Sequence, residues 1–325
     1  MSQLDTETAR LLERIQDLAV QISRDVADDL VLGRQLTDRL MADYAGTVPE
    51  DVLVTSLEIE TNAGALPLRL YRPSTPCSST GQPLVIFFHG GGWAVGSVAS
   101  YEPFIKSLCA KSGVLFLSVD FRLAPEHKFP TPLDDCRAAV RWAQREAMTI
   151  GVDPRGICVM GDSAGANLAV VTAWCIAKQT GYRLCAQYLL YPFLDLRAPH
   201  GRYPSRERFG NGQFLISRDD LDHSAQWYLE DTQKRDAPEV SPILLPDLSL
   251  LPPTILVTAG FDPLADEGRL LGRKLARADV PLVARHFDNT IHGFLPFGIL
   301  TVAQEGQEWL ARNIREKSVG AACRS

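Results

Sequence analysis

The sequence has few of the features of a nucleic-acid-binding or membrane-spanning protein. Its 39 acidic residues outnumber its 33 Lys and Arg residues, and the net charge of −6 argues against a basic surface for DNA, RNA or anionic membranes. The longest apolar stretch, around residues 168–177, is far shorter than the roughly 20 residues that a membrane span requires. Residues 1–20 carry charged side chains at helical spacing, unlike a signal peptide. We expect a cytoplasmic protein with no nucleic-acid partner and no stable membrane association.

Paired cysteines are also lacking. The chain has seven cysteines, an odd number, and no Cys-x-x-Cys pair. Secreted disulfide frameworks favour even counts and metal sites need tighter clusters, so we expect reduced, mostly buried thiols. Cys158, Cys175 and Cys185 lie in apolar stretches, where cysteine behaves as a small hydrophobic residue. The cysteine pattern therefore predicts neither a disulfide framework nor a metal site.

What the sequence does contain is the pattern of an α/β protein. The chain has 325 residues, of which 46% are hydrophobic and 22% charged, an ordinary globular composition. From residue 83 onward, short solid apolar runs alternate with segments of helical periodicity. Runs that are apolar on both faces predict a mostly parallel central sheet flanked by helices. The predicted strands are 84–88, 114–119, 157–160, 186–190, 254–258 and 282–287, and the predicted helices between and after them are 102–111, 133–149, 164–178, 267–278 and 301–315.

The part of the chain before this alternation has a different character. Residues 1–50 show apolar side chains at three- and four-residue steps, which predicts helices. Residues 51–72 contain two strand-like runs on either side of the polar sequence Asn62-Ala63-Gly64. That arrangement predicts an antiparallel hairpin.

One later segment, residues 195–240, interrupts the alternation. It is rich in Arg, Gly, Asp and Glu and has no strand-like run, although residues 219–229 have a helical pattern. An insertion at the carboxyl edge of a parallel sheet lies where loops form sites, so this segment is a candidate lid; a long solvated connection is the alternative. The chain then divides into a helical cap segment, a first core part, a cap insertion and a second core part, at 1–50, 51–194, 195–240 and 241–325.

The strongest catalytic signal is the sequence GDSAG at residues 161–165. It directly follows the apolar run 157–160 and directly precedes a helix, which is the strand–turn–helix context that a G-x-S-x-G nucleophile requires. The sharp turn would lift the Ser163 hydroxyl clear of the sheet at a helix N-terminus, where anionic intermediates are stabilised. A serine N-cap in a glycine-bracketed turn is the alternative interpretation, and the context disfavours it.

The second signal is the sequence HGGGW at residues 89–93, at the end of another predicted strand. Successive glycines expose backbone N–H groups, which together with the Ala164 amide would form an oxyanion hole. A phosphate loop is disfavoured because the G-K-[ST] ending is absent. We expect Trp93 to form part of a pocket wall and His89 to give structural support.

A serine nucleophile needs a base, and His292 is the best candidate. His200 and His223 lie in the polar insertion, where a solvated position is expected, and His286 lies inside a strand run. His292 falls just past that run, on a loop from which a base could reach Ser163.

The base in turn needs an orienting acid, which this topology places between the serine and the histidine in chain order. Asp262 stands just past the strand 254–258, and a turn cap is its alternative role. Asp266 and Glu267 are better explained as acids at a helix N-terminus.

Several motifs together resemble one family. HGGGW, GDSAG, DPLADE and the final IHGF are similar to those of hormone-sensitive-lipase-like esterases, the bacterial acetyl-esterase and arylacetamide-deacetylase group of α/β-hydrolases. FRLAPEHKFP with the following Asp134-Asp135, and Val240-Ser241-Pro242, resemble the same family. The similarity runs in order from about residue 83 to residue 298.

The resemblance implies a role for particular residues. It implies an α/β-hydrolase fold with a helical cap over the acyl pocket, made by the N-terminal helices and the insertion. The implied site consists of a nucleophile, an acid, a base and three oxyanion-hole amides, which are Ser163, Asp262, His292, Gly91, Gly92 and Ala164.

We therefore predict a carboxylic ester hydrolase that works by acyl transfer, without a metal or organic cofactor. Bulky residues near the site, Trp93, Phe214 and Phe294, would leave a slot for short- to medium-chain acyl esters, from acetyl to hexanoyl. For Phe294, an ordinary core position is an equal alternative. The partner is then a small-molecule ester. An amidase or formamidase with the same triad, and a non-catalytic small-ligand receptor on the same fold, are the alternatives. The resemblance also allows a homodimer through the edge near residues 282–287.

Overall fold

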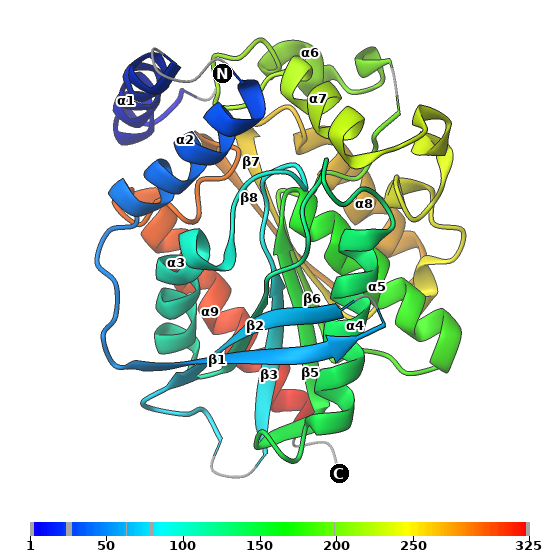
Figure 1. The fold of residues 1–325 in the computed structure, drawn as a ribbon. Helices are drawn as coiled ribbons and strands as arrows, with labels where there is room; N and C mark the ends of the chain where they lie inside the picture. The colour runs from blue at the N-terminus through cyan, green and yellow to red at the C-terminus, as the bar shows by residue number, and fades with distance from the viewer. Residues whose placement is uncertain (1–2, 24–27, 63, 79–80, 198, 323–325) are drawn as a thin grey trace.

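The computed structural model of the chain describes residues 3–23, 28–62, 64–78, 81–197 and 199–322. Ala63 of the predicted hairpin turn and Cys323 lie outside these ranges. A central sheet separates two helical layers, as Figure 1 shows. The strands are β1 (Val52–Thr61), β2 (Gly64–Pro73), β3 (Gln82–Phe88), β4 (Leu115–Val119), β5 (Val152–Asp162), β6 (Gln187–Leu190), β7 (Thr254–Phe261) and β8 (Leu282–Ile291).

The helices follow the predicted pattern, and short elements are added in the insertion and just after it. The long helices are α1 (Thr6–Ser23), α2 (Asp29–Asp43), α3 (Val98–Ser112), α4 (Thr131–Glu146), α5 (Ala164–Thr180), α7 (Arg218–Tyr228), α8 (Ala265–Arg277) and α9 (Thr301–Ala322). The shorter ones are α6 (Pro204–Phe209) and the 3₁₀ turns η1 (His200–Arg202), η2 (Thr232–Asp236), η3 (Pro242–Leu244) and η4 (Leu248–Leu250).

The sheet has eight strands in the order β1-β2-β4-β3-β5-β6-β7-β8. Neighbours from β4 to β8 pair in parallel, whereas β2 pairs antiparallel with both β1 and β4. The predicted hairpin is confirmed, since Thr61 pairs with Gly64 across its turn. The mostly parallel sheet is confirmed as well, because apolar runs such as β4 are buried along their whole length.

The two faces of the sheet carry separate hydrophobic cores. Helices α4, α5 and α8 contribute to one core, and α1, α3 and α9 to the other. Helix α5 is the most enclosed of them, because every residue from Ala164 to Ala177 is buried. A helix that is apolar all round fits only in such an interior position. Its N-terminus therefore begins inside the molecule, at the end of β5.

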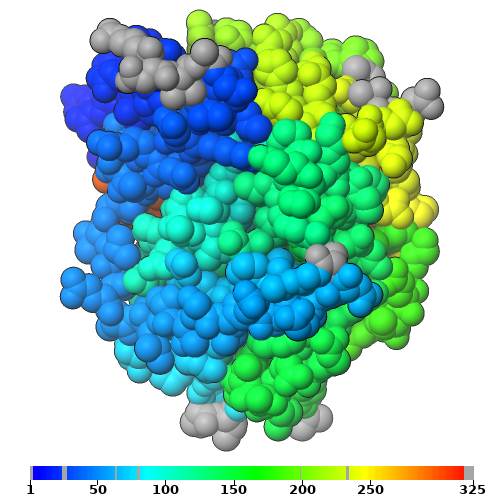
Figure 2. Space-filling model, in the orientation of Figure 1, coloured from blue at the N-terminus to red at the C-terminus, as the bar shows by residue number. Residues whose placement is uncertain are grey.

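The N-terminal helices and the insertion lie at the carboxyl end of the parallel strands. Figure 1 shows α1 and α2 on one side of this end and α6 and α7 on the other. In Figure 2, the N-terminal segment (blue) and the insertion (yellow-green) meet at the top of the molecule. Arg34 of α2 is one anchor, because its guanidinium donates to the carbonyls of Ala94 and Ala124 and pairs with Glu126 at 2.7 Å.

β8 forms one edge of the sheet, where the sequence allowed a homodimer; that dimer stays a prediction. None of the helices in the described ranges combines the length and apolar character that crossing a bilayer requires. The described cysteines form no disulfide, and Cys109, Cys136, Cys158 and Cys175 are buried.

Candidate active site

Ser163 occupies a strained turn between β5 and α5. Its φ of +52° and ψ of −117° are outside the regions that side-chain-bearing residues normally adopt. The turn packs so tightly on the end of β3 that a Cβ atom on Gly165 would lie 2.0 Å from the Phe88 carbonyl oxygen. Glycine is therefore required at this position. The outcome is a partly exposed serine hydroxyl at the N-terminus of a buried helix.

The predicted base and acid meet at this serine. The Oγ atom of Ser163 lies 2.9 Å from Nε2 of His292, and Nδ1 of His292 lies 3.0 Å from Oδ2 of Asp262. Asp262 is fully buried, and its other carboxylate oxygen accepts the Leu264 N–H at 2.7 Å. A carboxylate at Nδ1 favours the tautomer in which Nε2 is free to accept the serine proton. Asp262 thus caps its own turn and also orients His292.

The topology explains why three distant residues converge. Ser163 follows β5, Asp262 follows β7 and His292 follows β8. The carboxyl ends of parallel strands share one edge of a sheet, so residues just past these strands come together. The other histidine candidates remain apart: His286 contacts Thr258 and Arg269, and His200 is a half-buried partner of Asp222 rather than a solvated side chain.

The glycine loop after β3 supplies backbone donors beside Ser163. Within the described ranges, the N–H groups of Gly91, Gly92 and Ala164 make no hydrogen bond. Gly91 has a φ of +103°, and a Cβ atom there would lie 2.2 Å from the Val95 carbonyl oxygen. Ala164 begins α5, so its amide is one of the unpaired donors of a helix N-terminus. These three amides stay the predicted oxyanion donors.

The chain is similar in sequence and in fold to known proteins. The chain matches the alpha/beta hydrolase fold family over residues 85–296. It is 37% identical over 277 residues to the carboxylic ester hydrolase LipN of Mycobacterium tuberculosis, covering 83% of this chain and 71% of that protein. It is 35% identical over 266 residues to an arylesterase of Saccharolobus solfataricus, covering 81% and 83%. The solved ester hydrolase EH1AB1 from the metagenome of Lake Arreo matches with a TM-score of 0.88 and 30% identity, covering 97% of this chain and 99% of that chain.

This chain belongs to the α/β-hydrolase fold family. The fold and the family predicted from the sequence are both confirmed. The order of the parallel strands and the turn after β5 are the features on which the site of this α/β-hydrolase is built.

Asp162 is a residue whose importance the sequence analysis missed. Its buried carboxylate accepts the Gly90 N–H at 2.7 Å and the Tyr101 hydroxyl at 3.0 Å. Burial raises the pKa of this carboxyl to about 6, and the two hydrogen bonds limit the rise. Asp162 therefore ties the glycine loop of the hydrolase to the turn of Ser163. The sequence does contain a signal for this role: an acidic residue stands between the apolar run 157–160 and the predicted nucleophile Ser163.

Tyr191 was missed as well. It follows β6 directly, has a φ of +37°, and its N–H donates to the Val257 carbonyl at 2.7 Å. Its ring packs edge-on against the imidazole of His292, with centroids 5.0 Å apart. The Tyr191 ring thus helps to fix the orientation of the His292 imidazole.

Two predicted pocket residues lie in the interior instead. Trp93 is fully buried and stacks on Tyr228, with ring centroids 4.2 Å apart. Phe294 is fully buried between Tyr191 and Phe287. Their burial does not favour a place beside the acyl slot, and that role stays a prediction. Nearness to a motif in sequence does not determine which way a side chain points.

Phe214 keeps its candidate role. It is half-buried in the insertion and contacts the ring of Phe261, which directly precedes Asp262, at a centroid distance of 5.1 Å. The neighbouring Leu215 lies within 3.5 Å of the position that a Cβ atom on Gly293 would take. Phe214 therefore lies on a loop that reaches the histidine side of the site.

His89 has the supporting position that the sequence suggested. Its buried Nδ1 lies 2.7 Å from the Gly90 carbonyl oxygen, and its ring stacks on Phe121 with centroids 4.4 Å apart. Burial lowers the pKa of this imidazole, which favours the neutral form. His89 braces the start of the glycine loop.

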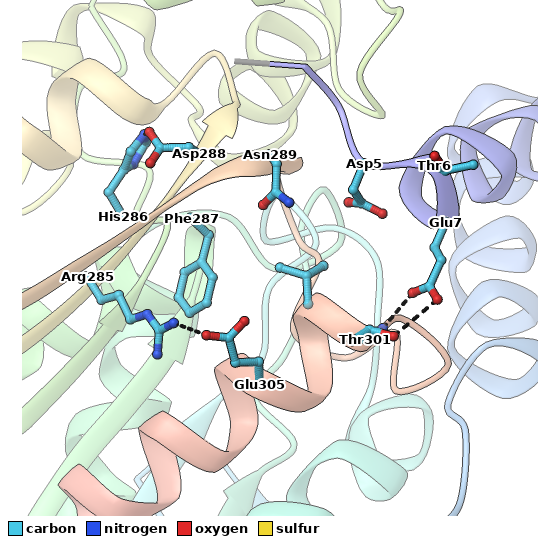
Figure 3. A pocket seen from close by; sticks show the side chains of 11 residues that line it. Asp5, Thr6, Glu7, Arg285, His286, Phe287, Asp288, Asn289, Thr301 and Glu305 are labelled. Carbon is cyan, nitrogen blue, oxygen red and sulfur yellow. Dashed lines mark hydrogen bonds and ion pairs between the residues drawn. The ribbon is translucent and has the colours of Figure 1, made fainter.

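A cavity of about 640 Å³ lies away from the triad, between the start of α1, the edge strand β8 and the start of α9 (Figure 3). Two pairs of its lining residues contact each other: Arg285 pairs with Glu305, and Glu7 accepts hydrogen bonds from the amide and hydroxyl of Thr301. None of its lining residues belongs to the candidate site at Ser163.

Proposed function

We propose that this chain hydrolyses short- to medium-chain carboxylic esters, with Ser163 as nucleophile, His292 as base and Asp262 as acid. One observation carries the proposal: a continuous hydrogen-bonded line from Ser163 through His292 to Asp262, of 2.9 and 3.0 Å, at a strained strand-to-helix turn. The names of its relatives, a carboxylic ester hydrolase and an arylesterase, support the same class of reaction.

In the acylation step, His292 Nε2 takes the hydroxyl proton of Ser163 while Oγ attacks the ester carbonyl carbon. The negative charge that develops on the carbonyl oxygen is held by the amides of Gly91, Gly92 and Ala164. One such donor is typically worth about 3 to 4 kcal/mol of barrier. When the tetrahedral intermediate collapses, the alcohol leaves with the proton from His292 and the acyl group stays on Ser163.

Deacylation repeats these steps with water. His292 takes a proton from the attacking water, the same amides hold the oxyanion, and the carboxylic acid leaves as Ser163 regains its proton. Asp262 keeps the imidazole in the required tautomer and stabilises its charged form. The reaction as proposed uses neither a metal nor an organic cofactor.

The position of the insertion supports a preference for short acyl groups, because the insertion contacts residues on both sides of the site. On the oxyanion side, a Cβ atom on Gly92 would lie 2.3 Å from the Ser224 hydroxyl of α7. On the histidine side, Leu215 and Phe214 approach Gly293 and Phe261. The insertion therefore comes close to the site on both sides, which supports acetyl to hexanoyl esters over long-chain triglycerides.

The test is hydrolysis of p-nitrophenyl acetate, butyrate, octanoate and palmitate by the wild type and by Ser163→Ala. We expect rates that peak at short chains and fall by at least about 10⁴-fold in the variant, because the nucleophile is lost. Folded wild-type protein without activity on any ester, or a variant that keeps its activity, would refute the proposal. Matched p-nitroanilides test the amidase alternative in the same assay.

A further inference from the structure

Asp262 lies on a turn, residues 262–266, that links β7 to α8 and is called the acid turn below. The ladder between β7 and β8 loses its regular register just before it: Ala259 pairs with Phe287, whereas Phe261 pairs with Ile291. The sheet therefore holds Asp262 less directly than it holds Ser163. Within the turn, the Ala265 N–H donates to the Asp262 carbonyl oxygen at 3.1 Å.

The insertion is hydrogen-bonded to the acid turn through Ser205, which lies near the N-terminus of α6. The Ser205 hydroxyl donates to the Pro263 carbonyl at 2.8 Å and accepts the Asp266 N–H at 3.2 Å. Its own N–H donates to the Asp266 carboxylate at 2.8 Å. Ser205 is buried, so its hydrogen bond to Pro263 is shielded from competing water, while the two to Asp266 are partly buried. One residue of the insertion thus contacts both ends of the segment 263–266.

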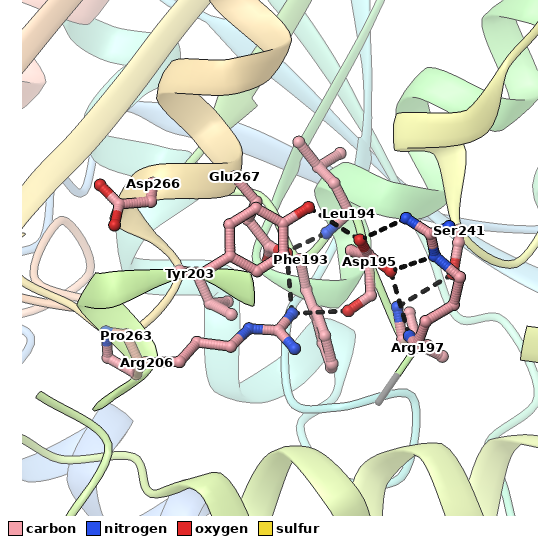
Figure 4. A network of polar contacts seen from close by, with 12 residues as sticks. Phe193, Leu194, Asp195, Arg197, Tyr203, Arg206, Ser241, Pro263, Asp266 and Glu267 are labelled. Carbon is pink, nitrogen blue, oxygen red and sulfur yellow. Dashed lines mark hydrogen bonds and ion pairs between the residues drawn. The ribbon is translucent and has the colours of Figure 1, made fainter. Parts of the chain in front are cut away.

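The next residue, Arg206, strengthens the same attachment (Figure 4). Its buried guanidinium donates to the Glu267 carboxylate at 2.7 Å and to the Asp195 carbonyl at 2.5 Å. Glu267 is fully buried in the first turn of α8, and its second oxygen accepts the Leu194 N–H at 3.2 Å. Burial raises the pKa of Glu267 to about 8, and Arg206 keeps it from rising further. The pair joins α6 to the helix that starts at the acid turn.

We propose that Ser205 and Arg206 are positioning residues for the reaction: α6 holds the acid turn so that Asp262 stays in contact with His292. The inference rests on the proposed function and goes beyond it, since it gives the insertion a part in catalysis as well as in substrate selection. Displacement of a catalytic group by about 1 Å can cost about 10²-fold in rate. Ser205 acts through Asp262 and does not touch the reacting atoms.

Ser241 offers a matched control within the same polar network. It is buried, accepts the Leu196 N–H at 2.9 Å and donates to the Arg235 carbonyl at 2.7 Å. Ser241→Ala therefore removes the same kinds of hydrogen bond as Ser205→Ala, but at a distance from the acid turn. A purely structural role for Ser205 predicts equal behaviour of the two variants.

The first experiment measures Tm, kcat and KM of Ser205→Ala and Ser241→Ala with p-nitrophenyl butyrate. We expect a similar small loss of Tm in both, because each loses buried hydrogen bonds. Only Ser205→Ala should lose kcat, by about tenfold, with KM changed less than about twofold. Equal kcat values in the two variants would overturn the proposal. If Ser205→Ala does not fold, Arg206→Lys is compared with Ser241→Ala by the same criterion.

The second experiment asks whether Ser205 acts through Asp262. In an Asp262→Asn background, Ser205→Ala should lower kcat by less than about twofold further, because the carboxylate that it positions is gone. A full additional tenfold loss would contradict the proposal.

Failure of the proposed function would give a different result: a wild type without esterase activity, or activity that survives Ser163→Ala. An active wild type in which Ser205→Ala matches Ser241→Ala refutes only the positioning role.

Discussion

The two sides of this active site are held in different ways. Ser163 and the glycine loop are held by the sheet itself, since the carboxyl half of β5 pairs with both β3 and β6. Asp162 also joins the glycine loop to the turn of Ser163 from inside the core. Asp262 follows a strand whose ladder is irregular, and Ser205 and Arg206 of the insertion hold its turn from outside. The proposed nucleophile is therefore built into the sheet, whereas the turn of the proposed acid also contacts a separate segment.

This difference predicts that a substitution near Ser163 and a substitution near Asp262 affect stability and catalysis to different extents. Damage on the nucleophile side disturbs the central strands, so it should cost folding free energy first. A substitution on the acid side should leave the sheet intact and disturb the contact by which Asp262 orients His292. Three changes test this contrast.

The largest effect is expected for Gly165→Ala, on the nucleophile side. The new Cβ atom would lie 2.0 Å from the Phe88 carbonyl oxygen, a backbone atom that cannot move without shifting β3. The free energy of unfolding, measured in urea, should fall by more than about 4 kcal/mol. The control is Gly33→Ala in α2, where the Cβ atom would meet Val95 at 3.5 Å and helix propensity should add up to about 1 kcal/mol. Wild-type stability of Gly165→Ala would show that the turn tolerates a side chain.

A smaller effect is expected for Arg206→Met in the insertion. The change removes the guanidinium hydrogen bonds to the fully buried Glu267 carboxyl group and to the Asp195 carbonyl, so the free energy of unfolding should fall by about 3 kcal/mol. Arg218→Met is the control, because Arg218 and its partner Glu207 are 38% and 51% exposed. Its loss should stay below about 1 kcal/mol. Equal losses, measured by urea unfolding at pH 7, would mean that the buried pair does not anchor α6.

The smallest effect concerns the pH dependence of Asp162→Asn. The folded protein keeps Asp162 protonated up to about pH 6, whereas the unfolded chain releases this proton near its ordinary pKa of about 3.9. Between these values the folded state binds more protons, so stability falls as pH rises. The wild type should therefore lose about 1.4 kcal/mol relative to the variant between pH 5 and pH 8.

Urea unfolding of both proteins at these two pH values measures that difference. An asparagine at this position can still accept from the Gly90 amide, so the loop contact is preserved in the comparison. Parallel pH profiles of stability would contradict the buried, proton-binding state of Asp162.

Most strands of the parallel sheet were predictable, because a strand that is buried on both faces appears in the sequence as a solid apolar run. Each predicted apolar run from residue 84 onward overlaps a strand, and the helices between them follow. The G-x-S-x-G sequence was predictable for a related reason, since a turn that packs on the end of β3 demands glycine. The candidate acid and histidine followed from chain order and from their places just past strand ends.

Side-chain direction was not predictable in the same way. Trp93 and Phe294 adjoin motifs, but the backbone turns them into the core. Glu267 was expected at a helix N-terminus and does lie there, yet its burial against Arg206 depends on a segment about sixty residues earlier in the chain. No local pattern encodes such a contact.

The sequence by itself determined the alternation of strands and helices, the turn at Ser163 and the order of Ser163, Asp262 and His292, because these depend on backbone conformation and burial over a few residues. Only the tertiary structure decided how Asp162, Tyr191 and Ser205 brace the site. Those contacts join elements that are distant in the chain, and they form only when the sheet and the insertion pack together.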